Sequence, residues 1–371
     1  MSSIVIQRSV TFINGETPAK LTIKDIDLDK CYNDNEIVVK VHSAALNPVD
    51  LLVHHSANRH VVSSGLKTYG RDYAGIIVKK GRKVDPKFQV GDKINGQITH
   101  LYGEQGSVSN YLVVNPAQNA SIGFMNDFGY LDFDIKTHYN EYDLNASYPL
   151  VFGTAYMVLF NNGQHWNPNS KILVHGASTA VSQCLIQIAK KHLNVGTVVG
   201  ICNSKSFEYN KKAGFDHLIA YDEPEYLEKV QALVKDTFKG EKFDLIFDSV
   251  GTSQYFPIID EILKPRNENS IYTTIAGNDK LKYEGGLLDY ARRLPFSYYL
   301  NSFNPWRKFN YVLTMLGPKS EYMELASLMI HKKQFIPPLD SVYKLDDFQK
   351  ALDKLNSNKA KGKVIIRIVD E

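Results

Sequence analysis

Cysteine is scarce in this sequence, and its charges form no blocks. Only Cys31, Cys184 and Cys202 occur among 371 residues, and they are widely spaced. This excludes a disulfide framework and a metal lobe built from paired cysteines, and it fits a reducing compartment. The 43 basic and 40 acidic residues are interspersed and give a net charge of +3. Because no basic tract could follow a phosphate backbone, we do not expect nucleic acid to be a partner.

Long apolar runs and targeting signals are also absent. No apolar run approaches the length of a membrane span. The N-terminus, MSSIVIQRSV, lacks the basic-then-apolar order of a secretory signal and the Arg/Ser bias of a transit peptide. We therefore expect a cytoplasmic location. With 43% apolar and 22% charged residues, the composition is that of an ordinary globular protein, and the length allows two domains with separate cores.

The hydrophobic pattern changes along the chain. Residues 1–120 contain short alternating apolar stretches such as EIVVKVHSAAL and NYLVVN, separated by turns, which predicts a mostly antiparallel β domain. From Lys171 onward, apolar runs such as KILVHG and FDLIFDSVG alternate with helical patterns. That alternation predicts a parallel sheet covered by helices on both faces, so the fold class is α/β. The closing strand, GKVIIRIV, has the character of the β domain and suggests that the C-terminus returns to it.

The stretch VHGASTAVSQ, residues 174–183, stands where a dinucleotide-binding loop belongs, between an apolar strand and an apolar helix. Such a loop usually has three glycines, which permit a tight turn, close approach of backbone N–H groups to the pyrophosphate, and helix packing. Here Ala177, Thr179 and Ser182 stand at those positions, and the branched Thr179 projects toward the phosphate. In one interpretation the helix N-terminus and the nearby hydroxyls still bind the phosphates. In the other, the fold survives and cofactor affinity is weakened or lost. The cofactor-binding residues predicted for this loop are Gly176, Ala177, Ser178, Thr179, Ala180 and Val181.

Seven motifs occur in order along nearly the whole chain: ALNPVD (45–50), GRDYAG (70–75), VGDKI (90–94), FGTAY (152–156), KILVHGAS (171–178), FDSVG (247–251) and KGKVII (361–366). The ordered set resembles the medium-chain dehydrogenase/reductases, specifically their zinc-free quinone oxidoreductase branch. Within that branch the sequence is most similar to the Yim family of budding yeasts, which shares the glycine-poor loop. The resemblance implies a GroES-like, mostly β catalytic domain (residues 1–148 and 318–371), a Rossmann-type NADP-binding domain (residues 149–317), and an active cleft between them.

Two positions bear on zinc. Zinc-dependent members of this superfamily have a cysteine where this chain has Asn47 and a histidine where it has Arg71. Neither replacement can bind catalytic zinc as a thiolate or an imidazole would. The resemblance therefore implies hydride transfer from a reduced nicotinamide to a quinone or an α,β-unsaturated carbonyl, without a metal. We predict Asn47 as the catalytic residue, with its amide donating to the substrate carbonyl; the alternative is an Asn-Pro turn. The candidate proton sources are Tyr69, Tyr73, His54 and His55; the alternative is that these side chains are packing or surface groups.

After the second strand of the cofactor domain, where NAD-dependent proteins carry an acidic residue, this chain reads ICNSKS. With no carboxylate to repel a 2′-phosphate, and with Ser204 and Lys205 to donate to it, we predict NADPH as the cofactor. The alternative is a solvated helix start with ordinary surface lysines. The resemblance adds Tyr221, near the adenosine phosphate. Five further positions match the family around the nicotinamide half, although turn chemistry alone would also explain them: Thr154, Val250, Gly251, Ala276 and Gly277.

An aromatic and basic insertion occupies about residues 280–315. Within it, residues 290–311 are interpreted either as a lid over an apolar substrate or as a patch that rests on lipid. The resemblance implies an association with lipid droplets and mitochondria, and pairing of two copies through the sheet edge of the cofactor domain. It leaves a second hypothesis open, a reductase-like protein without turnover that acts by binding at an organelle surface. For an active enzyme, the partner is a small apolar carbonyl compound or quinone.

Overall fold

The computed structural model describes residues 3–57, 65–118, 120–280, 282–283, 288, 291, 296–304, 307–317 and 320–369. The chain forms two compact units. Unit 1 contains residues 1–153, 283–287 and 316–371, and unit 2 contains residues 154–282 and 288–315. The C-terminal segment therefore belongs to the same unit as the N-terminal strands. Within the described ranges, no helix has the length and apolar character needed to cross a bilayer.

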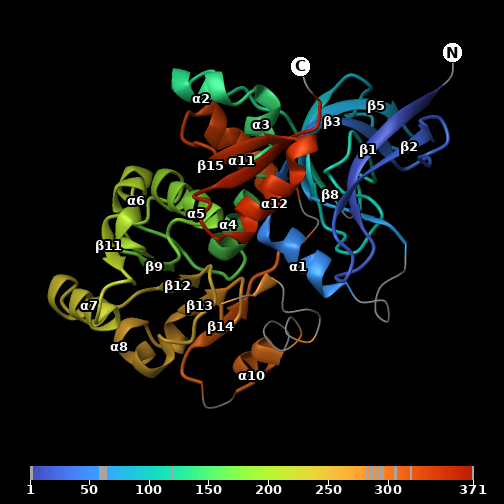
Figure 1. The fold of residues 1–371 in the computed structure, drawn as a ribbon. Coiled ribbons are helices and arrows are strands. Elements are labelled where there is room, and N and C mark those ends of the chain that lie inside the picture. Colours follow the sequence, from blue (N-terminus) through green and yellow to red (C-terminus); the bar gives the residue numbers. More distant parts are fainter. Residues whose placement is uncertain are drawn as a thin grey trace. The chain divides into compact units, whose positions relative to one another are not determined.

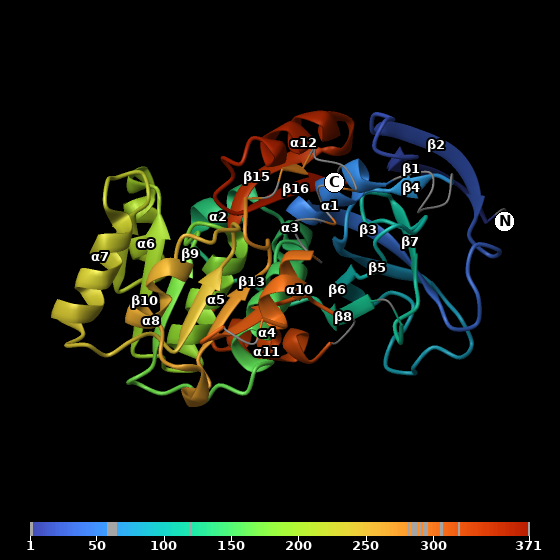
Figure 2. The same cartoon turned by 90° about the horizontal axis from the view of Figure 1, so that it is seen from below.

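Unit 1 is mainly antiparallel β-structure. A three-stranded sheet has the order β2-β1-β4, and a seven-stranded sheet has the order β15-β16-β3-β5-β6-β8, with β7 also paired to β3. The C-terminal strand β16, red in Figure 1, lies antiparallel to the blue strand β3, and Figure 2 shows the same pairing from below. The strands of unit 1 are β1 (Ile4–Phe12), β2 (Lys20–Asp27), β3 (Ile37–Leu46), β4 (Lys67–Thr68), β5 (Asp72–Lys80), β6 (Lys93–Ile98), β7 (Tyr111–Val114), β8 (Ala120–Phe124), β15 (Leu339–Lys344) and β16 (Lys363–Arg367).

The core of unit 1 forms around strand β3. Alternate residues Ile37, Val39 and Val41 are fully buried and share one hydrophobic cluster with Tyr73 and Ile77 of β5. These three residues follow the two-residue period of a strand. The intervening Val38 is fully buried as well, so both faces of this part of β3 are covered. The described helices that accompany these sheets are α1 (Pro48–Ser56), α2 (Phe133–His138), α3 (Glu141–Ala146), α11 (Glu321–His331) and α12 (Phe348–Asn356), together with α4 (Pro149–Phe160), which crosses the boundary between the units.

Unit 2 has a six-stranded parallel sheet in the order β11-β10-β9-β12-β13-β14. This is the 3-2-1-4-5-6 order of a doubly wound Rossmann sheet, so the predicted fold of this part is confirmed. All five residues of β9 are buried, as expected for a strand covered on both faces. The strands are β9 (Lys171–His175), β10 (Thr197–Cys202), β11 (His217–Ala220), β12 (Leu245–Asp248), β13 (Ile271–Thr274) and β14 (Asn310–Leu313). The described helices include α5 (Ala180–Lys191), α6 (Phe207–Ala213), α7 (Tyr226–Ala232), α8 (Ile259–Ile262) and α10 (Ser297–Ser302).

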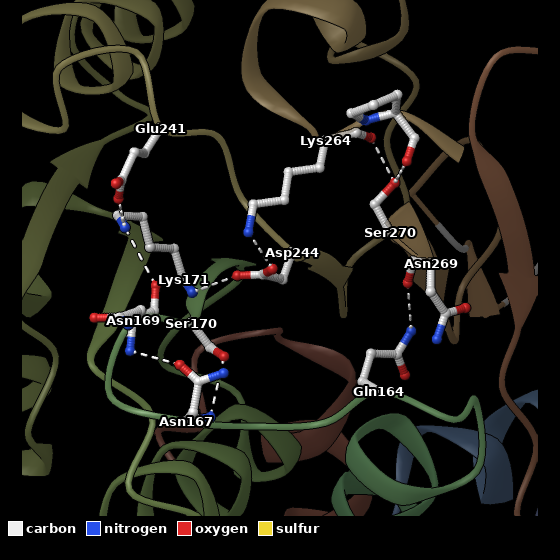
Figure 3. Close-up of polar contacts among 11 residues, drawn as sticks. Gln164, Asn167, Asn169, Ser170, Lys171, Glu241, Asp244, Lys264, Asn269 and Ser270 are labelled. Carbon is white, nitrogen blue, oxygen red and sulfur yellow. Dashed lines mark hydrogen bonds and ion pairs between the residues drawn. The ribbon is translucent and has the colours of Figure 1, made fainter. Parts of the chain in front are cut away.

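Polar contacts tie the amino-terminal ends of β9, β12 and β13 together (Figure 3). The backbone N–H of Lys171 donates to Asp244 Oδ2 at 2.7 Å, and Lys264 Nζ lies 2.6 Å from Asp244 Oδ1. The Lys171 ammonium also binds the carboxylate of Glu241. Open α/β sheets bind ligands at the carboxyl ends of their strands. These contacts lie at the opposite end, where they stabilise the sheet without involving the carboxyl ends of the strands.

The aromatic and basic segment is only partly described. Helix α10 and its flanks carry four strongly exposed apolar side chains, with 57–70% of each residue accessible: Phe296, Tyr299, Leu300 and Phe303. The Arg307 guanidinium lies 4.7 Å from the ring centres of both Phe256 and Phe309. Five residues used in the lid or patch hypothesis lie outside the described residues: Arg292, Arg293, Pro295, Pro305 and Trp306. The choice between lid and patch therefore stays a prediction.

Candidate cofactor site and catalytic residues

Strand β9 ends in a turn that only glycine fits. Gly176 has a φ of +84°, and a Cβ built on it would come within 2.4 Å of Ser249 Oγ and 2.5 Å of Val250 Cγ2. The next residue, Ala177, is fully buried, and its N–H donates to Ile201 O of the neighbouring strand β10 at 2.9 Å. The turn after β9 therefore passes close to the loop that follows β12.

Thr179 is the N-cap of helix α5. Its Oγ1 accepts the N–H of Ser182 at 3.3 Å, and it lies 2.9 Å from Ser182 Oγ and 3.1 Å from Ser249 Oγ. The Ser249 hydroxyl donates to His175 O at 2.8 Å. Where other loops have glycines, this one has a hydroxyl cluster that fixes the helix start. Ser249 was not among the predicted residues, although its place directly after a strand in the FDSVG motif was an available signal.

The N-terminus of α5 still offers unused backbone donors. Among the described residues, no hydrogen bond uses the backbone N–H groups of Ser178, Ala180 and Val181. Ser178 Oγ accepts a hydrogen bond from Asn210 Nδ2 at 2.8 Å, so its own hydrogen can still be donated. Unused N–H groups at the positive end of a helix dipole form a site for an anion. The residues present therefore fit the phosphates of a dinucleotide, even without the usual glycines.

A buried carboxylate organises the loop after β12. Asp248 accepts the backbone N–H groups of Val250 at 3.0 Å, Gly251 at 2.8 Å and Thr252 at 2.8 Å. Burial raises the pKa of this carboxyl, while His175 and the three N–H groups oppose the rise. Asp248 was not predicted as a site residue. A lone aspartate that closes an apolar strand run, as in LIFD, was the signal that could have identified it.

The same carboxylate links this loop to the next one. Asp248 Oδ2 lies 3.3 Å from Thr274 Oγ1, which accepts the N–H groups of Ala276 and Gly277 at 3.1 Å each. Gly251 has a φ of +97°, and a Cβ there would lie 2.3 Å from a backbone carbonyl oxygen. The predicted loop residues at the ends of β9, β12 and β13 therefore form one connected group. Thr154 lies on α4 and is 6% exposed.

The predicted 2′-phosphate site contains a carboxylate. The backbone N–H and the hydroxyl of Ser204 both donate to Asp222, each at 2.8 Å. These contacts, and the nearby charge of Lys205, lower the pKa of Asp222. The expectation that no carboxylate faces Ser204 is therefore wrong. That expectation was based on the residues that follow β10. Asp222 follows β11, the neighbouring strand in the sheet. Lys205 and Tyr221 are both exposed at the surface of this region.

In unit 1, Asn47 belongs to a buried polar cluster. It is 1% exposed, and it precedes helix α1 as the N-cap. Its Nδ2 donates to Asp72 Oδ2 at 2.9 Å, and its Oδ1 accepts from Lys363 Nζ at 2.6 Å. Lys363 Nζ also donates to Asp72 Oδ2 at 2.7 Å. The amide is thus bonded within the protein, and its predicted donation to a substrate would require a change of partner. Asp72 and Lys363 were not predicted, although both lie within quoted motifs.

A second buried pair lies beside the first. Asp50 Oδ1 is 3.7 Å from Arg71 Nε, and Asp50 Oδ2 accepts the backbone N–H of Asn47 at 2.7 Å. Burial raises the pKa of Asp50 to about 6, against the opposing charge of Arg71. The Asn47 position thus presents a carboxamide together with the cations Arg71 and Lys363, which does not fit a zinc ion. Within the described residues, no group of three or more His, Cys, Asp or Glu side chains could hold a metal ion.

Of the candidate proton sources, Tyr69 and His54 bind each other. The Tyr69 hydroxyl is hydrogen-bonded to His54 Nδ1, and His54 Nε2 lies 2.7 Å from the carbonyl oxygen of Thr17. Because a carbonyl oxygen only accepts, Nε2 carries the ring hydrogen and Nδ1 accepts from the phenol. Burial raises the pKa of Tyr69 and lowers the pKa of His54. In this arrangement the tyrosine proton is held by histidine and is not directed to a ligand.

Known proteins resemble both units. The protein-family model described as Alcohol dehydrogenase GroES-like domain matches residues 33–123 of this chain. The family model described as Zinc-binding dehydrogenase matches residues 213–366. The first match lies in unit 1 and confirms the predicted GroES-like fold. Among solved structures, a quinone oxidoreductase from Coxiella burnetii has a TM-score of 0.73 at 17% identity, covering 98% of this chain and 100% of its own. A crotonyl-CoA carboxylase/reductase has a TM-score of 0.74 at 16% identity, covering 98% of this chain and 88% of its own.

Two curated relatives are similar over their whole length. Protein YIM1 of Candida glabrata is 47% identical over 369 residues, which cover 98% of this chain and 100% of the relative. Protein YIM1 of Saccharomyces cerevisiae is 43% identical over 365 residues, which cover 98% of this chain and 99% of the relative. With the GroES-like and dehydrogenase matches, this similarity fixes the family. The chain belongs to the Yim1 proteins of yeasts, within the medium-chain dehydrogenase/reductases.

Proposed function

We propose that the protein transfers hydride from NADPH, whose 2′-phosphate the exposed Lys205 would attract, to a quinone or an α,β-unsaturated carbonyl compound. The observation that carries the proposal is the set of unused N–H groups of Ser178, Ala180 and Val181 at the first helix of a Rossmann sheet. Solved structures with this fold include a quinone oxidoreductase and the CurK enoyl reductase, which supports the reaction class. The nicotinamide, when bound, supplies the hydride. The protein binds and orients both reactants.

The substrate oxygen must be stabilised by hydrogen bonds, because the residues around Asn47 do not fit zinc. We retain Asn47 as the proposed donor. Its amide would exchange Asp72 for the substrate oxygen, while Lys363 stays bonded to Oδ1. A cation at the amide oxygen draws electron density from the nitrogen and makes its N–H a stronger donor. With a bound nicotinamide supplying the hydride and water supplying the proton, a quinone would become a hydroquinone.

Turnover tests this proposal. The purified full-length protein would be mixed with NADPH and a panel of quinones and enones, and loss of nicotinamide absorbance would be compared with the reduced product formed. Equal amounts of NADPH consumed and product formed are expected. No consumption with any member of the panel would rule out a reductase of this class.

A second candidate function rests on the exposed apolar side chains around α10, from Phe296 to Phe303. In this alternative, the protein binds a lipid surface, such as that of a lipid droplet or mitochondrion, without turnover. Flotation of the protein with phospholipid vesicles would support it. Replacing Leu300 and Phe303 with serine should then abolish flotation, and flotation that survives the replacement would contradict it.

A further inference from the structure

Two turns at neighbouring strand ends are joined by one carboxylate. Strands β10 and β11 are parallel, with Cys202 opposite Ala220 in the register. The turn after β10 contains Ser204, and the turn after β11 contains Asp222. Asp222 Oδ1 accepts the Ser204 N–H and Oδ2 accepts the Ser204 hydroxyl, both at 2.8 Å. Asp222 is exposed, so the carboxylate is also accessible to a ligand at this edge of the sheet.

The turn after the second strand is where a Rossmann sheet receives the adenosine ribose. A ribose with a free 2′-hydroxyl can donate to a carboxylate, whereas a 2′-phosphate is an anion that a carboxylate repels. The Asp222 contact also uses the backbone and hydroxyl hydrogens of Ser204 that a phosphate would otherwise accept. Each carboxylate oxygen keeps a further lone pair for the ribose hydroxyls. The contact therefore acts against the 2′-phosphate in two ways, by charge and by occupying donors.

One cation opposes this effect. The charge of Lys205 acts on Asp222 and contributes to keeping it ionised. The backbone N–H of Lys205 donates to Asn203 Oδ1 at 3.1 Å, which fixes the residue within the turn. Lys205 is exposed. Its positive charge would attract a 2′-phosphate that the charge of Asp222 would repel.

We propose that Asp222 determines nucleotide specificity by lowering the preference for NADPH relative to NADH, against the attraction of Lys205. This inference rests on the proposed function, because it assumes that a nicotinamide dinucleotide binds along this sheet end. It assigns discrimination to a residue after the third strand. The second strand, which is the usual source of the acidic residue, ends here in Cys202 and is followed by Asn203.

The test is the ratio of the NADH and NADPH dissociation constants, measured by nicotinamide fluorescence at one salt concentration. Asp222→Asn keeps the size of the side chain and removes its charge. We expect the ratio to move toward NADPH by about tenfold, because one repulsive charge is removed near the 2′-phosphate. Lys205→Gln should move the ratio in the opposite direction. Glu225→Gln is the matched control, since this exposed carboxylate makes no contact with Ser204, and its ratio should equal that of the wild type.

The outcomes separate the two claims. If the wild type binds a nucleotide and Asp222→Asn leaves the ratio unchanged, the specificity inference is overturned and the proposed function stands. If the wild type binds neither nucleotide, the proposed function is overturned, and the inference falls with it. A shift of the ratio that Glu225→Gln reproduces would show a general charge effect and would also overturn the assignment to Asp222. Thermal unfolding of each variant confirms that the compared proteins are folded.

Discussion

Asp50 is buried in unit 1, and this burial gives a prediction about how stability depends on pH. Burial raises its pKa in the folded protein to about 6, above the reference value of 3.8. The folded state therefore holds the proton more tightly than the unfolded state, so ionising Asp50 lowers stability. This cost is absent below about pH 4, grows as the pH rises to about 6, and is constant above, with a size on the order of 3 kcal/mol.

Asp50→Asn should remove this part of the pH dependence. The free energy of unfolding of the variant, relative to the wild type, should rise between about pH 4 and about pH 6. Urea unfolding of both proteins at several pH values across this window measures it. A difference between the two proteins that is the same at both ends of the window would contradict the assignment.

Lys363 gives a second prediction at the scale of single residues. Its ammonium is bonded to Asp72, which is 0% exposed, and to Asn47. Removing the cation alone in Lys363→Met leaves the buried Asp72 carboxylate without this countercharge and should cost about 3 to 5 kcal/mol of unfolding free energy. The double variant Asp72→Asn with Lys363→Met should recover part of that loss. The exposed Lys359→Met serves as a control. Equal losses in Lys363→Met and the control would show that the pair does not stabilise the protein.

Among the helices, α5 gives a prediction about Thr179, which caps the helix and also lies beside the turn after β9. Thr179 caps the helix through Oγ1, while its methyl group lies close to Gly176 in the turn after β9, where the phosphates are proposed to bind. Thr179→Ser keeps the cap and removes the methyl group. We expect an unchanged unfolding temperature and a tighter NADPH dissociation constant. Thr179→Val should instead lose the cap and cost about 0.5 to 2 kcal/mol. If Thr179→Ser binds NADPH no better than the wild type, the methyl group does not limit affinity.

The sheet of unit 2 could be predicted from sequence because its strands are short apolar runs between helical patterns. KILVH and LIFD are buried on both faces, and this local property decides their structure. The polar contacts of the candidate site could not be predicted in this way. Ser204 meets Asp222 across 18 positions, Thr179 meets Ser249 across 70, and Asn47 meets Lys363 across 316. Such contacts depend on how the strands are ordered, which a local pattern does not contain.

In the molecule as a whole, the two units differ in where their charged side chains lie. Unit 2 closes the amino-terminal end of its sheet with ion pairs around Asp244. At the opposite end, no described residue accepts the N–H groups of Ser178, Ala180 and Val181. Unit 1 buries the charges of Asp72 and Lys363. The function proposed above assigns the nucleotide to unit 2 and the substrate oxygen to Asn47 of unit 1. It depends most on whether a nucleotide binds to unit 2.

The most direct measurement is the NADPH dissociation constant of the wild type and of Ala180→Glu, by nicotinamide fluorescence at one salt concentration. A glutamate at the first position of α5 should stabilise the helix by about 0.3 to 1 kcal/mol through its dipole. The same charge should repel the pyrophosphate. The account predicts saturable binding by the wild type and binding about tenfold weaker in Ala180→Glu, with an unfolding temperature that does not fall. No binding by the wild type at millimolar NADPH, or equal dissociation constants in the two proteins, would contradict it.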